Sequence, residues 1–226
     1  MKILTISSGI FVLLSSNKYI QIININKIEY PILVLSSILG MMVMISSNDL
    51  ILFYIGLELQ SLALYVLASF NRDNLLSSES GLKYFVLSAL SSGILLYGCS
   101  LIYGFSGSTN FFTIADNLTE NSHGLTFGIV FILVGLAFKI SAVPFHMWAP
   151  DVYEGAPTIV STFFAVVPKI AILGLFIRLF MFSFYDLVGF WQQLLVFSSL
   201  TSMVLAALIA LKQRKLKRFF AYSLKF

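Results

Sequence analysis

Long runs of apolar residues, each close to the length of a membrane-crossing helix, are the feature of this sequence that most limits its fold. A helix of about 20 apolar residues crosses about 30 Å of hydrocarbon. Hydrophobic residues make up 58% of the chain and charged residues only 11%, whereas a soluble domain carries about 25% charged residues. The sequence therefore predicts an all-α integral membrane protein.

Seven apolar segments with short polar connectors between them are expected to be transmembrane helices. They lie near 3–16, 31–47, 49–70, 80–105, 124–148, 157–182 and 190–211. The first segment is short and rich in serine, so it meets the length requirement least well. No internal repeat or low-complexity linker is visible, and a single membrane domain over 1–226 is the simplest division.

The basic residues of the connectors predict an orientation. If the N-terminus faces outward, the inner connectors carry eight basic residues and the outer connectors carry none. The eight are Lys18, Lys27, Arg72, Lys212, Arg214, Lys215, Lys217 and Arg218. Because cytoplasmic-type loops are enriched in Lys and Arg, this split favours an outer N-terminus and an inner basic tail over 212–226. The same placement argues against nucleic acid as a partner.

Three charged residues lie near the middle of predicted spans, namely Glu58, Lys139 and Lys169. A charge at the bilayer centre costs at least about 2.5–3.5 kcal/mol, so such residues pair, line water or perform a function. Proton or ion handling is the favoured interpretation, and a structural buried ion pair is the alternative. Lys83 and Arg178 lie nearer helix ends, from which long side chains can also reach the interface.

Prolines accompany both central lysines. Pro168 directly precedes Lys169 and Pro144 follows Lys139, and a proline inside a helix frees a backbone carbonyl about four residues back. We therefore expect a broken helix beside each lysine, lining a wet cavity. His146 is a further relay candidate because its side chain titrates near neutral pH, although a structural histidine is an equal alternative.

Motifs for other chemistry are missing from the sequence. It contains no dinucleotide-binding glycine motif, P-loop, HExxH or paired Cys/His spacing, and its one cysteine, Cys99, lies in an apolar run. The glycine- and serine-rich stretch "SALSSGILLYG" is typical of close helix packing. Heavy use of Phe, Ile, Asn and Lys, whose codons are AT-rich, hints at an organellar genome.

Four stretches together resemble the subunit 2 family of respiratory NADH:ubiquinone oxidoreductase (complex I), the antiporter-like family shared with Mrp-type antiporters. They are "YIGLELQSLALYVLASF", "GLKYFVLSALSSGILLYGCSLIYG", "VPFHMWAPDVYEGAP" and "VVPKIAILGLFIRLF". The resemblance covers roughly residues 30–223. It implies one antiporter-like five-helix repeat over about 31–182, with flanking helices near 3–16 and 190–211.

The resemblance also implies roles for individual residues. Glu58 and Lys139 take the places of a switchable Glu/Lys pair, and Lys169 takes that of a second lysine that passes the proton toward the middle of the membrane. His146 matches a histidine just beyond the helix break, and Lys83 a further polar position. NADH, FMN, iron–sulfur clusters and ubiquinone would be bound by other subunits, so no cofactor is expected in this chain.

Family members have about fourteen helices, and the sequence departs from them at both ends. It is expected to lack the first two helices and the second repeat. A split gene, with a second chain supplying the other half, is favoured over a degenerate subunit. The predicted location is the mitochondrial inner membrane, with a mitochondrial gene, other membrane-arm subunits as partners and cardiolipin near the basic loops.

Two other functions remain open at this point. The chain could be an assembly scaffold without a proton path, or a fragment of a stand-alone cation/proton antiporter. The three mid-membrane charges beside two predicted helix breaks favour proton translocation over the scaffold.

Overall fold

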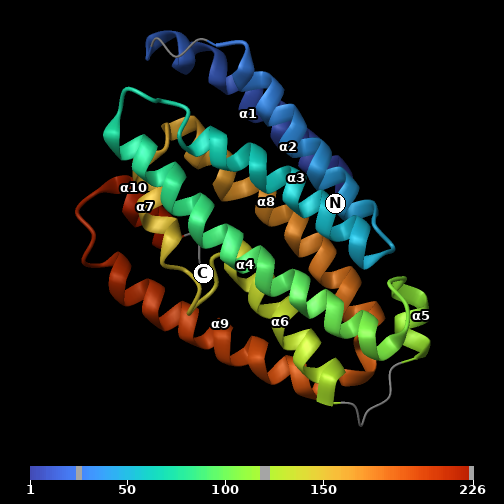
Figure 1. The fold of residues 1–226 in the computed structure, drawn as a ribbon. Helices are drawn as coiled ribbons and strands as arrows, with labels where there is room; N and C mark the ends of the chain where they lie inside the picture. The colour runs from blue at the N-terminus through green and yellow to red at the C-terminus, as the bar shows by residue number, and fades with distance from the viewer. Residues whose placement is uncertain (24–26, 118–122, 224–226) are drawn as a thin grey trace.

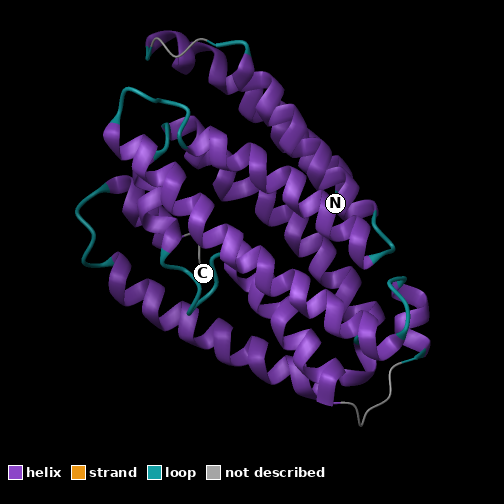
Figure 2. Ribbon diagram, viewed as in Figure 1, coloured by secondary structure: helices purple, strands orange, loops and turns teal. Residues whose placement is uncertain are grey.

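The computed structural model describes residues 1–23, 27–117 and 123–223, and every regular element within them is helical (Figures 1 and 2). The last three residues of the predicted basic tail lie outside this part. The elements are α1 (Lys2–Ile22), α2 (Glu29–Ser46), α3 (Leu50–Ala68), α4 (Leu75–Ser106), α5 (Phe111–Asp116), α6 (His123–Lys139), α7 (Trp148–Gly155), α8 (Thr158–Arg178), a π-helical turn (Leu179–Ser183), a 3-10 turn (Tyr185–Leu187), α9 (Val188–Ala210) and α10 (Leu216–Ser223).

Within the described residues, six helices are long and apolar enough to cross a membrane: α1, α2, α3, α4, α8 with its π-helical turn, and α9 with its 3-10 turn. This confirms the predicted all-α membrane class. The first span is longer than expected, since α1 extends to Ile22. The segment predicted near 124–148 is instead a helix of 17 residues that ends at Lys139.

Glycines bring the helix backbones of two pairs into contact. Gly40 of α2 faces Gly56 of α3, and a Cβ atom on Gly40 would lie 2.8 Å from the Gly56 carbonyl oxygen. Gly98 of α4 faces Gly128 of α6, with the same distance of 2.8 Å to the Gly128 carbonyl oxygen. Small residues at such contacts allow close packing within a bilayer. The first contact pairs α2 with α3, and the second pairs α4 with α6, the helix that ends at Lys139.

The chain leaves the helical conformation directly after Lys139. Ser141 has a φ of 59°, in the left-handed region, and the Ala142 amide donates to the Ala137 carbonyl at 2.9 Å. The Trp148 indole, at the start of α7, donates to the Phe138 carbonyl at 2.9 Å. The carbonyl groups at the end of α6 therefore have partners, although the helix ends within the protein.

The two prolines act differently from the expectation. Pro144 lies in the segment after α6, so the break precedes it and does not arise from a proline inside the helix. Pro168 lies within α8, which continues as a helix from Thr158 to Arg178. The predicted helix break beside Lys139 is confirmed, because α6 ends at that residue. The predicted break beside Lys169 is wrong, because α8 continues through Pro168.

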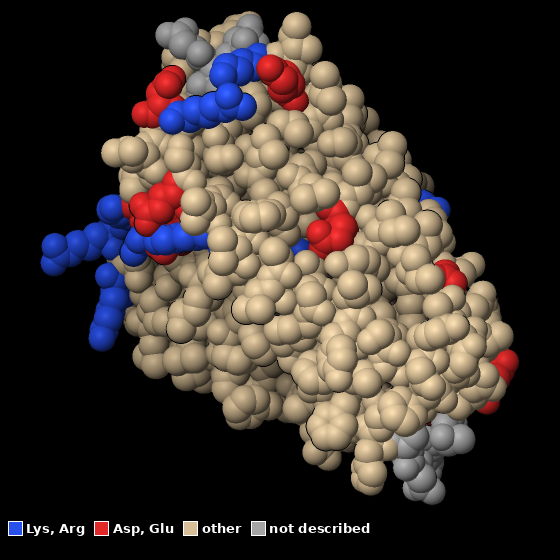
Figure 3. Space-filling model, in the orientation of Figure 1, with Lys and Arg blue, Asp and Glu red and all other residues tan. Residues whose placement is uncertain are grey.

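Charged side chains are unevenly distributed over the surface. In Figure 3 most blue and red atoms lie toward one end of the molecule, at the upper left, and one red group with blue beside it interrupts the tan surface near the middle. The opposite end is held by Arg178, whose guanidinium donates to the Ile45 carbonyl at 2.9 Å and to the Asn48 side chain. There the neighbouring Thr109 hydroxyl donates to the Asp49 carboxylate at 2.5 Å.

Candidate functional site

The ammonium group of Lys139 is buried among hydroxyl groups from two other helices. The residue is 6% exposed, and its Nζ donates to Ser88 Oγ at 2.6 Å, Ser61 Oγ at 2.8 Å and Tyr65 OH at 3.4 Å. An ammonium group has three hydrogens to donate, so these acceptors match its capacity. The Tyr65 hydroxyl in turn donates to Ser88 at 2.8 Å. We call Lys139, Ser61, Tyr65 and Ser88 the hydroxyl cage.

Glu58 lies on α3 one turn before Ser61, on the same face of the helix as Ser61 and Tyr65. Its Oε1 atom is buried and has no hydrogen-bond partner among the described residues. No ion pair joins Glu58 to Lys139 within that part of the chain, but the carboxylate acts electrostatically on the ammonium group at longer range. The structure thus brings the predicted Glu and Lys into one region without direct contact.

Lys169 lines a cavity of about 280 Å³ between the end of α6, α8 and α9. Ala137, Ile140 and Ser141, which flank Lys139 in the chain, form one wall. The opposite wall carries serine hydroxyl groups of α9, at positions 198, 199 and 202. The lining of this cavity therefore includes residues at the break after Lys139, Lys169 itself and the serines of α9.

His146 lies in the segment that joins the break to α7, and its ring is buried. It faces the Tyr222 ring of α10 edge-on, with 6.4 Å between the centroids. The structure places this histidine beyond the break, with its ring against α10.

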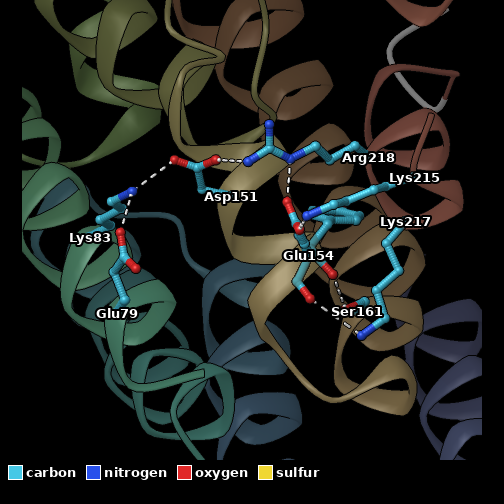
Figure 4. A network of polar contacts seen from close by, with 9 residues as sticks. Glu79, Lys83, Asp151, Glu154, Ser161, Lys215, Lys217 and Arg218 are labelled. Atoms are coloured by element: carbon cyan, nitrogen blue, oxygen red, sulfur yellow. Dashed lines mark hydrogen bonds and ion pairs between the residues drawn. The ribbon is translucent and has the colours of Figure 1, made fainter. Parts of the chain in front are cut away.

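Lys83 lies apart from the hydroxyl cage, in a network of ion pairs at the charged end of the bundle (Figure 4). Its ammonium group contacts Glu79 at 2.8 Å and Asp151 at 3.0 Å. Asp151 also binds Arg218 of α10 at 2.9 Å, and Glu154 binds Arg218 and Lys215. We call these six residues the ion-pair network. It joins α4, α7 and α10, because Asp151 and Glu154 of α7 bind side chains of the other two helices.

The carboxyl group of Glu154 is held in its ionised form by this network. Partial burial opposes ionisation, but hydrogen bonds from Lys215 and Arg218 outweigh the burial and lower the pKa of Glu154. The same contact raises the pKa of Arg218. The Glu154–Arg218 pair therefore stays charged at neutral pH.

Sequence reasoning missed the hydroxyl cage and the role of Trp148. Ser61 and Tyr65 follow Glu58 at helical spacing, a signal that was available, whereas Ser88 belongs to the stretch interpreted as a packing patch. That interpretation holds for Ser91, which donates to the Gly135 carbonyl of α6 at 3.3 Å. Trp148 is buried and stacks on Tyr84 with 4.6 Å between the ring centroids.

No group of three or more His, Cys, Asp or Glu side chains suited to a metal ion is present in the described ranges. The candidate site is therefore the set of titratable and hydroxyl-bearing side chains given above.

Comparison with known proteins gives the family. Residues 47–224 match the family model "NADH:quinone oxidoreductase/Mrp antiporter, TM". The chain is 70% identical over 223 residues to NADH-quinone oxidoreductase subunit N of Pelagibacter ubique, covering 99% of this chain and 47% of that protein. It is 56% identical over 225 residues to subunit N of Rhodospirillum rubrum, covering 98% of this chain and 46% of that protein.

Solved structures agree with the sequence matches. A chain of respiratory complex I from Thermus thermophilus superposes with a TM-score of 0.77 at 35% identity, over 88% of this chain and 43% of that one. A chain of the Mrp complex from Dietzia superposes with a TM-score of 0.78 at 25% identity, over 87% of this chain and 37% of that one.

The chain spans about half the length of the curated relatives it matches, 47% in the case of Pelagibacter ubique. These relatives are bacterial proteins, so they give no support to the expected mitochondrial location. The matches in sequence and in fold agree with the resemblance carried by the motifs. The chain belongs to the NADH:quinone oxidoreductase/Mrp antiporter family of membrane proteins.

Proposed function

We propose that the chain is a membrane-arm subunit of a proton-pumping NADH:quinone oxidoreductase, in which it provides a proton half-channel driven by quinone reduction elsewhere in the complex. Its similarity to bacterial subunit N supports this role. The observation that carries the proposal is the environment of Lys139, a buried ammonium group whose hydrogen-bond acceptors are the hydroxyl groups of Ser61, Tyr65 and Ser88.

Hydroxyl groups suit proton transfer because each one both accepts and donates a hydrogen bond. A proton that leaves Lys139 for a hydroxyl oxygen leaves a neutral amine behind, and the hydroxyl passes its own proton on. The negative charge of Glu58 favours the ammonium form of Lys139. Neutralisation or displacement of Glu58 would release the proton, and the return of its charge would draw the next one in.

The cavity beside Lys169 gives the proton an onward path. A volume of about 280 Å³ accommodates several water molecules, since each occupies about 30 Å³ in the liquid. In this relay Lys169 receives the proton from the cavity wall next to Lys139 and passes it along the α9 serines. His146, beyond the break, connects the path toward α10. Lys83 belongs to the exposed end of the relay, where the ion-pair network meets water.

The proposal extends to the arrangement of the chain and to its partners. We propose one membrane domain over 1–226, with the repeat over about 31–182, an outer N-terminus and an inner basic tail. Other membrane-arm subunits, a second chain that supplies the remaining half, and cardiolipin are the proposed partners. The proposed membrane is the one that holds the complex, and the finer proposal is the mitochondrial inner membrane.

The test is to replace Lys139 with methionine in the assembled complex. Lys139→Met removes the titratable group and keeps most of the side-chain volume. The expected result is intact assembly with a several-fold fall in protons translocated per NADH oxidised, measured in sealed vesicles with a pH-sensitive dye. The matched control is Lys2→Met, which removes an exposed lysine at the start of α1.

Normal pumping by an assembled Lys139→Met complex would contradict the assigned role. If Glu58→Gln and Lys169→Met also pump normally, alone or combined, the chain is a structural scaffold. A chain found only outside a large redox complex would instead be an antiporter fragment.

A further inference from the structure

A cavity of about 210 Å³ opens at the charged end of the bundle, between α4, α7 and α10. The ion-pair network (Figure 4) lines it, together with Ser80 of α4. The side chain of Lys83 in its wall is 42% exposed, so the cavity is open to water. We call it the charged cavity. It brings water up to α4 at the level of Ser80 and Lys83.

Tyr84 lies on α4 midway between the charged cavity and the hydroxyl cage. Ser80 lines the cavity, Ser88 belongs to the cage, and Tyr84 is four residues from each. Residues four apart lie on the same face of a helix, and four residues span about 6 Å along its axis. All three side chains are buried, with Tyr84 4% exposed. A path along this face of α4 from the cavity to Lys139 therefore passes the side chain of Tyr84.

The Tyr84 ring contacts both sites. It meets the ring of Tyr65, a member of the hydroxyl cage, edge-on with 5.0 Å between the centroids. It also stacks on Trp148 with 4.6 Å between the centroids, and Trp148 begins α7, which forms a wall of the charged cavity. The carboxylate of Glu58, one turn before the cage on α3, acts electrostatically on Tyr84. The ring thus connects the cavity wall to the cage.

The Tyr84 hydroxyl group has no hydrogen-bond partner among the described residues, whereas the Tyr65 hydroxyl donates to Ser88. Ser80, one turn toward the cavity, donates to the Ser77 carbonyl at 2.8 Å. Buried polar groups are nearly always paired, either with protein or with ordered water. Because a phenol hydroxyl both donates and accepts, that of Tyr84 can bind water toward the cavity and toward the cage at once.

We infer that Tyr84 carries protons from the charged cavity to the hydroxyl cage around Lys139, an inference that rests on the proposed function. A protonated water molecule on the cavity side donates a proton to the Tyr84 oxygen, and the hydroxyl group releases its own hydrogen toward the cage. The phenol is neutral before and after this transfer. A cage hydroxyl passes the proton on by the same exchange, and it ends on the neutral amine of Lys139, which becomes ammonium. Bridging water covers the helical turn on each side of Tyr84, as it does between other polar groups too far apart for direct contact.

The test compares two tyrosines of α4 in the assembled complex. Tyr84→Phe removes the hydroxyl group and keeps the ring on Trp148, so assembly should be intact while the protons translocated per NADH oxidised fall several-fold. Tyr97→Phe is the matched control, because Tyr97 is 56% exposed on the same helix, and it should pump normally. Incorporation of 3-fluorotyrosine at position 84 returns a hydroxyl group to the ring and should restore pumping. Pumping is measured in sealed vesicles with a pH-sensitive dye.

Equal pumping by Tyr84→Phe and Tyr97→Phe would overturn the inference, and a proton leak in Tyr84→Ala would then identify the ring as a plug. A defect that 3-fluorotyrosine does not restore would be due to packing, and this too would overturn it. Lys139→Met, measured in parallel, separates this result from the proposed function. Normal pumping by Tyr84→Phe beside impaired pumping by Lys139→Met would contradict only the role of Tyr84, whereas normal pumping by Lys139→Met would contradict the proposed function itself.

Discussion

The ammonium nitrogen of Lys139 lies 2.6 Å from the hydroxyl oxygen of Ser88, so the end of α6 is bound to the middle of α4. Ser88 also accepts a hydrogen bond from Tyr65 of α3. One serine thus connects three helices at the point where α6 ends.

Replacing Ser88 with alanine should impair the proposed relay without dismantling the helix bundle. A hydrogen bond to a charged group contributes about 1.5–3 kcal/mol, and water can replace part of it. The part of this free energy that water does not replace corresponds to a factor of roughly three to ten. We therefore expect a fall of that size in the protons translocated per NADH. Ser100→Ala is the control, because Ser100 is exposed on the same helix and donates only to the Tyr97 carbonyl. Equal pumping by the two variants would exclude a role for the Ser88 hydroxyl.

Adding one methyl group at Gly98 should destabilise the contact between α4 and α6. The new Cβ atom would lie 2.8 Å from the Gly128 carbonyl oxygen and 2.9 Å from the Ile132 amide nitrogen. Backbone atoms cannot move aside without displacing α6, and overpacking of this kind costs about 1–3 kcal/mol. Gly98→Ala should lower the thermal unfolding midpoint in detergent.

The control for this prediction lies on the same helix. A Cβ atom at Gly93 would meet no atom within 4 Å, and alanine favours a helix over glycine by about 1 kcal/mol. Gly93→Ala should leave the unfolding midpoint unchanged or raise it. A lower midpoint for both variants would show that the effect is not due to the α4–α6 contact.

These contacts show what the sequence alone could predict. The apolar runs predicted the long helices because a bilayer requires about 20 apolar residues for each crossing. They did not predict the end of α6 at Lys139, because the apolar sequence continues past that residue as far as Phe145. The helix ends through the backbone at Ser141 and a hydrogen bond from Trp148, which belongs to the next element.

The candidate site was predictable only in part. A charge in the middle of an apolar span is visible in the sequence, which is why Glu58, Lys139 and Lys169 could be named. Their surroundings depend on which faces of α3, α4 and α6 meet, and this is set by contacts between helices that are far apart in the sequence, such as the Gly98–Gly128 contact of α4 with α6. Lys83, which lies nearer a helix end in the sequence, is in the ion-pair network, because Asp151 and Glu79 are within reach.

Docking of α10 on α7 should weaken in acid. The pKa of Glu154 in the folded protein is lower than its ordinary value of 4.5, so its contribution to docking is present above that pH. The contribution is lost as the pH falls through the lowered pKa, when the carboxyl group takes up a proton. A spin label at Leu216→Cys in a Cys99→Ala background should become mobile below about pH 4.5.

Glu154→Gln provides the comparison for this titration. It removes the ionised form at every pH, so the label should be mobile already at pH 7 and should change little in acid. An acid transition of the same size in Glu154→Gln would assign the titration to another group.

The guanidinium group of Arg178 should not be replaceable by lysine. It donates to the Ile45 carbonyl and to the Asn48 side chain at once, whereas the single ammonium group of lysine lacks the planar fork. Arg178→Lys should lower the free energy of unfolding by about 1 kcal/mol and Arg178→Leu by about 2–3 kcal/mol, measured by denaturant titration in detergent. Arg72→Lys, at an exposed connector, should have no effect. Equal stability of Arg178→Lys, Arg178→Leu and Arg72→Lys would contradict a stabilising role for the two hydrogen bonds of the Arg178 guanidinium.

The helix α7 has a mechanical consequence. It is eight residues long, about 12 Å at 1.5 Å per residue, which is too short to bend. Its first residue, Trp148, holds the carbonyl next to Lys139, and Asp151 and Glu154 hold α10 and Lys83. This rod is hydrogen-bonded at one end to the Phe138 carbonyl and ion-paired at the other to α10. The end of α6 and the basic C-terminal helix are therefore connected through a single short rigid element.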